Sequence, residues 1–305
     1  METADMRMLI TGGSGFVGWN AVRYFVDRGV DVVASYRSLS HYLQTFDGHT
    51  AVELDLTDRQ SIDRVVARFQ PALILHTAAI TRPQSAHDPT EVHQVNVEAT
   101  ARLAEAAARH DAGLVHLSTD LVYAADAGVV DERTTPDPSG AGGYARSKLE
   151  SEQAIAGTNA RSIVLRPTLM FGDGPPRGNS FSMFLERKWE GNERAPLFVD
   201  QFRSFLFVDD LLSAIETVAM RHEAWGELYV CGGPERMSRA QFAARLAAVL
   251  GVDPSLIQPM RAAELPGYQG GASDITIDSS KLRALGWSAG TVEQGARSMI
   301  ARRRL

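Results

Sequence analysis

Short apolar runs alternate with longer segments of mixed polarity up to residue 170 of the chain. The apolar runs that predict strands are Met8–Ile10, Val30–Ala34, Thr50–Leu54, Pro71–His76, Gly113–Leu117 and Ser162–Leu165. The segments that predict helices are Phe16–Arg28, Asp58–Phe69, Pro89–His110 and Tyr144–Ile155. Apolar strands separated by helices are typical of a parallel sheet that is covered on both faces. The pattern therefore predicts an α/β fold of the Rossmann type, with a doubly wound parallel sheet.

The alternation changes after Gly172. The stretch from Gly172 to Asn179 holds three glycines and two prolines, so it predicts a loop. Beyond it, short strands mix with helices, at Ser180–Trp189 (helix), Ser204–Val208 (strand), Asp209–Arg221 (helix), Leu228–Val230 (strand) and Ser238–Leu250 (helix). We expect a dinucleotide-binding domain over residues 1–170, to which some later segments return. Residues 171–305 are expected to form mostly a smaller α/β substrate-binding lobe.

Composition and charge narrow the class of protein. The chain has 305 residues, 44% of them hydrophobic, and its one cysteine is Cys231. A single cysteine excludes an internal disulfide, and a net charge of −6 argues against a general nucleic-acid binder, because phosphate binding normally needs a basic face. No apolar stretch approaches the roughly 20 residues of a membrane span. Because residues Met1 to Met8 are polar and acidic, we expect no signal peptide and a cytoplasmic protein.

The histidines and the basic end of the chain carry no clear chemistry of their own. Five histidines are scattered without the spacing of metal ligands, namely His76, His87, His93, His110 and His116. Each is interpreted as a core or surface residue, and no metal is expected. The run Arg302–Arg304 is interpreted as a frayed tail, since it is too short for a nucleic-acid patch.

Three glycines follow the first predicted strand, at the start of the first predicted helix. They are Gly12, Gly15 and Gly18. Glycine lets a pyrophosphate approach the helix N-terminus, where unpaired N–H groups and the helix dipole favour anions. The context of strand, glycine turn and helix favours a dinucleotide site over an ordinary tight turn. We expect the pyrophosphate to lie over the segment from Gly12 to Val17, which includes Ser14 and Phe16.

The end of the second predicted strand bears on the choice of dinucleotide. An NAD site usually has an acidic residue there to bind the ribose hydroxyls. This chain has Arg37 and Ser38, which can hold a 2′-phosphate through charge-assisted hydrogen bonds. NADP is therefore the preferred cofactor, and NAD stays possible. Asp55 and Leu56 end the third strand, where they can meet the adenine, and Asp55 can at the same time be a helix cap just before Thr57.

A tyrosine and a lysine stand four residues apart on a predicted helix. Tyr144 and Lys148 therefore lie on one face. A neighbouring cation lowers the pKa of a phenol, which would suit Tyr144 to proton transfer near neutral pH. Thr119 follows the strand Gly113–Leu117, at the edge where doubly wound sheets bind ligands, and its hydroxyl can hydrogen-bond to a substrate carbonyl there. The same spacing also occurs on ordinary solvated helix faces.

Together, these motifs resemble the extended short-chain dehydrogenase/reductase superfamily over essentially the whole chain. The segments that carry the resemblance are Thr11–Gly18, Asp55–Leu56, His76–Ala79, Val95–Val97, Ser118–Tyr123, Tyr144–Lys148, Leu165–Pro167 and Arg203–Asp210. The resemblance implies a catalytic triad of Thr119, Tyr144 and Lys148. Tyr144 would be the general acid, and Lys148 would also hold the nicotinamide ribose and keep the pKa of the tyrosine low.

The same resemblance assigns further residues to the cofactor. Ala78, Ala79 and Pro167 are expected at the cofactor. Asn96 is expected behind the lysine, in a position for a proton relay.

Within the superfamily, the chain most resembles the dTDP-4-dehydrorhamnose reductase group, which reduces 4-keto sugar nucleotides with NAD(P)H. Leu121 stands where the related sugar-nucleotide dehydratases carry a glutamate, and a leucine cannot transfer a proton. The epimerase-reductase that makes GDP-fucose uses a cysteine after this strand, whereas Cys231 lies far along the chain.

Four residues are expected at the substrate on the strength of this resemblance. Thr81 and Asp120 fit the reductase group. Arg203 and Asn179 resemble residues that bind the substrate phosphates in the epimerase and dehydratase branches. Arg203 can instead cap a strand, and Asn179 can instead cap the helix Ser180–Trp189.

We expect an NADPH-dependent reductase of a keto group on a nucleotide-activated deoxysugar. Three alternatives stay open: a sugar-nucleotide 4-epimerase, a reductase of a ketone without a nucleotide, and a non-catalytic NADP-binding regulatory subunit. Arg37 argues against the epimerase, because an enzyme that recycles its own cofactor gains little from choosing NADP. The resemblance also implies a homodimer built from the helices Pro89–His110 and Tyr144–Ile155. No nucleic-acid or membrane partner is expected.

Overall fold

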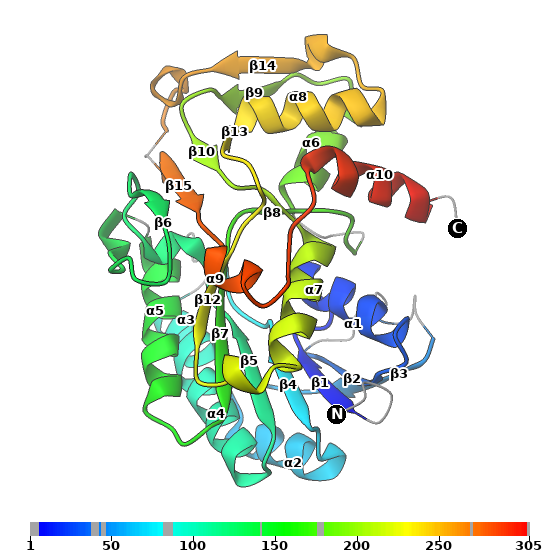
Figure 1. The fold of residues 1–305 in the computed structure, drawn as a ribbon, viewed down its shortest axis with the longest axis vertical. Coiled ribbons are helices and arrows are strands. Elements are labelled where there is room, and N and C mark those ends of the chain that lie inside the picture. Colours follow the sequence, from blue (N-terminus) through cyan, green and yellow to red (C-terminus); the bar gives the residue numbers. More distant parts are fainter. Residues whose placement is uncertain are drawn as a thin grey trace.

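Seven parallel strands form the central sheet in the computed structural model, which describes residues 6–37, 43, 47–81, 88–140, 142–175, 180–268 and 271–303. The order of the strands is β12-β7-β5-β4-β1-β2-β3 (Figure 1). Their bounds are β1 Arg7–Thr11, β2 Asp31–Tyr36, β3 His49–Glu53, β4 Leu73–His76, β5 Gly113–Leu117, β7 Ser162–Pro167 and β12 Leu228–Cys231. The chain order reverses between β1 and β4, and open α/β sheets bind ligands at such a point. The predicted α/β fold is confirmed.

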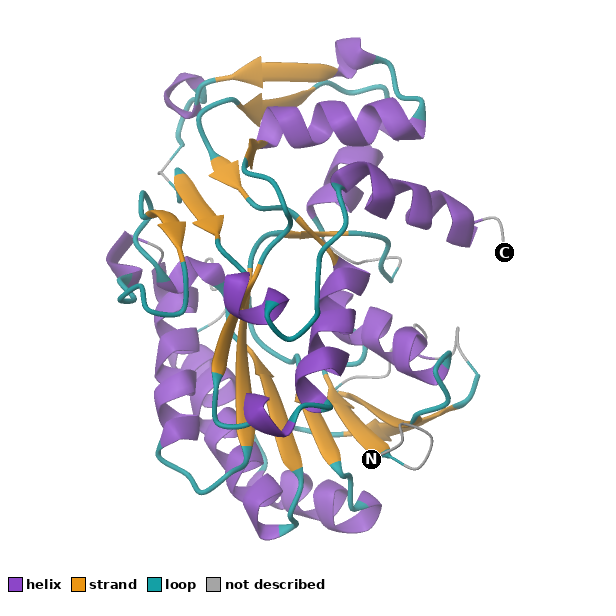
Figure 2. Cartoon of the chain, viewed as in Figure 1, coloured by secondary structure: helices purple, strands orange, loops and turns teal. Residues whose placement is uncertain are grey.

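Helices cover both faces of this sheet (Figure 2). One face carries α1 Phe16–Val26, α7 Val208–Ala219 and the short α9 Ser280–Arg283. The other carries α2 Arg59–Phe69, α3 Pro89–His93, the π-helical turn η3 Gln94–Glu98, α4 Ala99–Arg109 and α5 Gly142–Ala156.

Successive side chains of an inner strand enter opposite cores, which is why the inner strands are mostly apolar. Met8 and Ile10 of β1 pack in the core under α1 and α7, whereas Leu9 packs in the core under α2 and α4. In β4, Leu75 packs in the core under α1 and α7, and Ile74 packs in the core under α2 and α4. Each such side chain contributes about 1.5–3 kcal/mol by burial, so both layers of helices are held firmly to the sheet.

The smaller part of the chain is built from short strands and three helices at the opposite end of the molecule (Figure 1). Its sheets are β13-β10-β15-β6, β11-β8 and β14-β9. The bounds of the strands are β6 Gly128–Val130, β8 Met170–Phe171, β9 Ala195–Phe198, β10 Phe202–Arg203, β11 Leu206–Phe207, β13 Met237–Ser238, β14 Ile257–Met260 and β15 Asp274–Ile277. The helices are α6 Phe181–Glu190, α8 Arg239–Leu250 and α10 Val292–Arg303. Stacked phenylalanine rings, among them Phe205 and Phe242 with centroids 4.2 Å apart, fill its core.

The chain passes between the two parts more than once. β12 lies in the large sheet beside β7, and β6, from the first half of the sequence, pairs with β15 in the small sheet. The boundary at residue 170 stays a prediction.

Three local expectations need correction. The predicted strand Ser204–Val208 is wrong, since β10 ends at Arg203, β11 covers Leu206–Phe207 and Val208 begins α7. The long helix Pro89–His110 is interrupted by the π-helical turn η3. Arg302 and Arg303 lie in α10 and form ion pairs with Asp209 and with Asp173 and Glu186, so the described part of the C-terminal arginine run is not a frayed tail.

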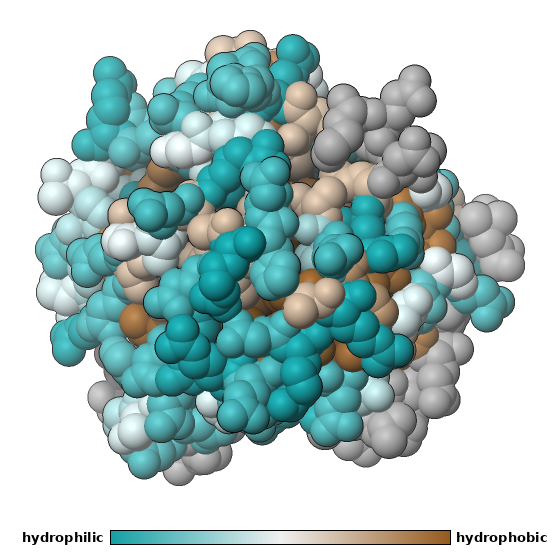
Figure 3. Space-filling model, turned by 90° about the horizontal axis from the view of Figure 1, so that it is seen from below, coloured by the Kyte–Doolittle hydropathy of each residue, from teal (hydrophilic) through white to brown (hydrophobic). Residues whose placement is uncertain are grey.

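The surface of the large domain shown in Figure 3 is mostly hydrophilic, with hydrophobic residues in small patches. None of the helices in the described part of the chain is long and apolar enough to cross a membrane.

Candidate active site

The glycine turn between β1 and α1 is shaped by close backbone contacts. Gly12 has a φ of +71°, and a Cβ there would lie 2.8 Å from the Cα of Ala78. A Cβ on Gly18 would collide with the carbonyl oxygen of Gly12. Gly15 precedes the first residue of α1 and brings no side-chain cap, so the first N–H groups of the helix can meet an anion. The turn thus fits a pyrophosphate.

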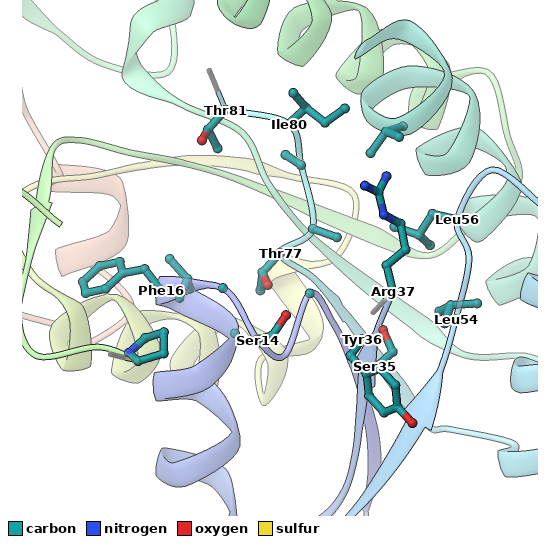
Figure 4. Close-up of a pocket in the computed structure, with 18 of the residues that line it drawn as sticks. Ser14, Phe16, Ser35, Tyr36, Arg37, Leu54, Leu56, Thr77, Ile80 and Thr81 are labelled. Atoms are coloured by element: carbon teal, nitrogen blue, oxygen red, sulfur yellow. The ribbon is translucent and has the colours of Figure 1, made fainter. Parts of the chain in front are cut away.

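A cavity of about 770 Å³ opens over this turn (Figure 4). Of the residues expected at the cofactor or the substrate, the cavity is lined by Gly12, Ser14, Gly15, Phe16, Val17, Gly18, Arg37, Asp55, Leu56, Ala78, Ala79 and Thr81. Arg37, Leu54 and Leu56 lie at one end, and Phe16 and Thr81 lie toward the other. Ser38 lies outside the described residues. Pro167 is buried at the end of β7 and is not among the residues that line the cavity, whereas Leu169 and Met170, which follow it in the chain, do line it.

The charged group of Arg37 is mostly exposed, whereas the charged group of Asp55 is bound by hydrogen bonds from its neighbour Thr57. The guanidinium of Arg37 is mostly exposed and lies 3.3 Å from a carboxylate oxygen of Glu91 on α3. The carboxylate of Asp55 accepts hydrogen bonds from the backbone N–H and the hydroxyl of Thr57, at 2.9 and 2.7 Å, which lower its pKa. Asp58 caps α2. The interpretation of Asp55 as a helix cap is therefore wrong, because Asp58 caps α2 and Asp55 binds Thr57 instead. Its place in the cavity wall leaves contact with the adenine open.

Asn96 holds by hydrogen bonds the backbone of Ile80, a residue that lines the cavity. Its amide exchanges two hydrogen bonds with the backbone of Ile80, at 2.8 and 3.0 Å, and donates a third to the hydroxyl of Ser147 at 2.9 Å. Asn96 is 1% exposed and stands in the π-helical turn η3, a geometry that is frequent at functional sites. Its side chain contacts the residue before Lys148, and among the described residues it has no hydrogen bond to the lysine itself.

The three expected catalytic residues come from two elements that pack against each other. Thr119 directly precedes the short 3-10 helix η4 Asp120–Val122, which packs on α5, the helix of Tyr144 and Lys148. Lys148 is 2% exposed, and burial lowers its pKa to about 7. Its ammonium nitrogen lies 3.2 Å from Nε2 of His116 on β5. Thr119 thus follows the carboxyl end of β5 and Lys148 contacts the same strand, whereas none of the three residues is among those that line the cavity over the glycine turn.

The pKa of Tyr144 differs from the expectation. Burial, and then the charge of Asp120, raise it above its usual value. The expected lowering by Lys148 is therefore not found in the protein without cofactor. A phenol that stays protonated at neutral pH can still donate a proton, as a reduction requires.

Asp120, one of the residues expected at the substrate, is a buried carboxylate with polar neighbours. Burial raises the pKa of Asp120, which accepts a hydrogen bond from the hydroxyl of Thr168 at 2.9 Å. Arg203, 4% exposed, lies 3.8 Å from Asp120 and donates to the backbone carbonyls of Phe202 and Ala272. Asn179 lies outside the described residues. The cap of α6 is Ser180, so the alternative that assigned the cap to Asn179 is wrong.

Several residues of the site had no signal in the sequence. Arg239, at the start of α8, is mostly buried, and burial together with the charge of Arg203 lowers its pKa. Phe181 and Ser180 line the dinucleotide cavity although they lie far along the chain from the glycine turn. His116 was interpreted as an ordinary histidine, and only its distance to Lys148 singles it out.

Comparisons with known proteins agree with this arrangement. The chain matches the family described as RmlD substrate binding domain over residues 6–304. A dTDP-4-dehydrorhamnose reductase of Mycolicibacterium smegmatis is 28% identical over 264 residues, 85% of this chain and 74% of that protein. The methionine adenosyltransferase 2 subunit beta of Bos taurus is 25% identical over 288 residues, 92% of this chain and 83% of that protein.

Solved structures share the fold. A dTDP-4-dehydrorhamnose reductase of Bacillus anthracis, in complex with NADP, superposes with a TM-score of 0.82 at 22% identity, covering 97% of this chain and 99% of that one.

Proposed function

The chain belongs to the RmlD substrate binding domain family, and we propose that it is an NADPH-dependent reductase of a keto group on a sugar nucleotide. The proposal rests above all on one observation: the helix of Tyr144 and Lys148 packs beside Thr119, at the same edge of the sheet as the dinucleotide cavity. The enzyme class and the NADP-type cofactor predicted from the sequence agree with the relatives.

The cavity suits a phosphorylated dinucleotide. Gly12 and Gly18 allow close backbone contacts within the turn that a Cβ would break, and the N-terminus of α1 borders the cavity beside them. Arg37 supplies an exposed cation at the end of the cavity opposite Phe16, where a 2′-phosphate can reach it. When bound, NADPH supplies the hydride for the carbonyl carbon.

The residues of the chain supply the proton and the orientation. Tyr144 donates its phenolic proton to the carbonyl oxygen as the hydride reaches the carbon, so the ketone becomes an alcohol. The ammonium of Lys148 holds the ribose hydroxyls and stabilises the phenolate that Tyr144 becomes. The hydroxyl of Thr119 accepts a hydrogen bond from the backbone N–H of Leu121 at 3.3 Å and donates a long one, 3.4 Å, to Asp120. Its proton can turn to the carbonyl oxygen of a substrate instead.

The substrate lobe offers positive charge for a diphosphate. Asp120 is the carboxylate whose charge acts on both Arg203 and Arg239, so two cations share one anion. Arg239 lies 5.4 Å from the ring of Phe181, which also lines the cofactor cavity. This surplus of positive charge favours a nucleotide sugar over a ketone without phosphates. Thr81, at the wall of the cavity, is proposed to face the sugar.

The experiment is a kinetic one. Purified protein is mixed with NADPH and a panel of 4-keto sugar nucleotides, and loss of the reduced cofactor is followed by absorbance. We expect oxidation of NADPH with at least one nucleotide sugar and a loss of about 10²–10⁴-fold in kcat for Tyr144→Phe. Tight NADPH binding without any oxidation across the panel would contradict the proposal.

A second candidate function is a non-catalytic subunit, because the chain is also similar to methionine adenosyltransferase 2 subunit beta along most of its length. The same assay separates the two, since a subunit of this kind binds NADPH without oxidising it. A 4-epimerase converts its substrate without net loss of reduced cofactor. The homodimer and the cytoplasmic location stay predictions.

A further inference from the structure

His116 is a buried histidine in direct contact with the proposed catalytic lysine. It is 0% exposed on β5, and its Nε2 lies 3.2 Å from Nζ of Lys148 and 2.9 Å from the hydroxyl of Ser151. Among the described residues, His116 is the one group to which the side chain of Lys148 is hydrogen-bonded.

The charge of Lys148 determines the direction of the hydrogen bond between the lysine and the histidine. An ammonium group can only donate, so the contact at 3.2 Å is a hydrogen bond when Nε2 of His116 carries the lone pair. The contact of Nε2 with Ser151, whose hydroxyl also donates to the backbone carbonyl of Lys148 at 2.6 Å, is compatible with either tautomer. Burial and the charge of Lys148 hold the pKa of His116 well below its usual range, so the imidazole is neutral. A neutral imidazole that accepts at Nε2 carries its proton on Nδ1, which has no partner among the described residues.

We propose that His116 is a positioning residue that accepts a hydrogen bond from the ammonium group of Lys148 and thereby keeps this lysine charged and correctly aimed. Two N–H donors of the ammonium then remain for the cofactor ribose and for the phenolate of Tyr144. The proposal rests on the proposed function, because it gives Lys148 the cofactor-binding role stated above.

The other charged groups around the lysine do not take over this task. Glu152 on α5 favours the ammonium electrostatically, but its carboxylate is held by Arg166 of β7, at 2.6 and 3.0 Å, and by the hydroxyl of Ser118. His76 on β4, with its ring centroid 5.2 Å from that of His116, is neutral and bonded to Thr11 and Thr100.

Two further groups face the same space. Asp120 on η4 is paired with Thr168 and lies near Arg203, and Tyr144 on α5 is protonated at neutral pH. His116 is thus the direct acceptor, and with this acceptor in place burial lowers the pKa of Lys148 to about 7. Without the acceptor, the lysine should lose its charge at a lower pH.

The test measures the affinity for NADPH as a function of pH, by fluorescence of the bound cofactor, and needs no sugar substrate. Four variants are compared with the wild type: His116→Phe, which removes the acceptor; His116→Asn, whose shorter side chain cannot reach the lysine; His116→Gln, which can; and His76→Phe. The last replaces a buried imidazole of the same layer that does not contact Lys148. Each of these proteins is also measured in combination with Lys148→Met, so that the pH dependence caused by groups other than Lys148 can be subtracted.

We expect the affinity of the wild type to begin to fall near pH 7. For His116→Phe and His116→Asn the fall should begin about one pH unit lower, while His116→Gln and His76→Phe keep the wild-type onset. An unchanged onset in both His116→Phe and His116→Asn would overturn the proposal. So would an equal shift in His76→Phe, or a wild-type profile identical to that of Lys148→Met.

Because His116→Asn and His116→Gln introduce polar side chains of graded length, the comparison stands even if His116→Phe does not fold. If no keto sugar is reduced in the kinetic assay, the proposed function fails, whereas the binding titration still tests His116.

Discussion

At the scale of the residue, we propose that the choice of cofactor depends on Arg37. Its guanidinium lies at one end of the cavity, is mostly exposed, and is paired with Glu91 of α3. An exposed ion pair of this kind contributes little stability, so a phosphate can replace the carboxylate at small cost. Arg37 is thus available to a 2′-phosphate.

The first prediction concerns this arginine. Arg37→Ala should weaken NADPH binding by about 10–100-fold, the loss of a charge-assisted hydrogen bond, and leave NADH binding nearly unchanged. Glu91→Gln is the matched control, since it removes the competing carboxylate and should strengthen NADPH binding. Titration calorimetry measures both. An equal loss for NADPH and NADH in Arg37→Ala would mean that the arginine shapes the cavity without reading the phosphate.

The second prediction concerns the stability of the protein without cofactor. Burial lowers the pKa of Lys148 from 10.5 to about 7, so between these values the unfolded chain binds more protons than the folded one. The free energy of unfolding contributed by this group therefore rises as the pH increases through this window. Urea unfolding at about pH 7 and about pH 9 should show the rise in the wild type and not in Lys148→Met. Equal slopes in the two proteins would contradict a pKa of Lys148 that burial lowers in the folded protein.

At the scale of the element, the π-helical turn η3 joins the wall of the cofactor cavity to the catalytic helix. The turn places Asn96 where its amide holds the backbone of Ile80 on one side and Ser147 of α5 on the other. The long helical pattern from Pro89 to His110 was predictable from its sequence. The π turn was not, because an inserted residue of this kind leaves the apolar pattern nearly unchanged.

The third prediction tests this joint. Asn96→Leu leaves the polar groups of Ile80 and Ser147 without their partner, at a cost of about 2–4 kcal/mol in the free energy of unfolding, and should also weaken NADPH binding. The exposed Glu98, on the same turn, serves as the control, and Glu98→Gln should change stability by less than about 1 kcal/mol. Chemical denaturation measures both. A small effect of Asn96→Leu would show that the turn is not held by this side chain.

At the scale of the whole molecule, the cofactor cavity draws on segments far apart in the sequence. Gly12 and Phe16 come from the first strand and helix, whereas Met170 and Phe181 lie beyond the predicted boundary of the large domain. A ligand in this cavity contacts both parts of the chain, and it should stabilise them together.

The fourth prediction follows from that. NADPH at 100 times its Kd should add about 2.7 kcal/mol and raise Tm by about 4 °C in a single transition, and Arg37→Ala at the same concentration should show a smaller shift. Calorimetry checks this. A first transition that does not respond to NADPH would mean that the two parts unfold separately.

The same scale explains what the sequence could and could not predict. The inner strands of the large sheet were predictable because they are mostly apolar on both faces, and the glycine turn was predictable because its spacing has a steric cause. The two-residue strands around Arg203 were missed, since so short a segment carries no periodicity. Arg239 and His116 reach the site only through the fold, and no local pattern distinguishes them from other arginines and histidines.

The most direct test of the central claim follows the hydride itself. NADPH that carries deuterium at the transferable position of its nicotinamide is incubated with the protein and a 4-keto sugar nucleotide, and the sugar product is analysed by mass spectrometry. The account predicts that the product gains one deuterium on the carbon of the former carbonyl, and that Tyr144→Phe forms this product far more slowly. A chain that binds NADPH but leaves every keto sugar without deuterium would contradict it.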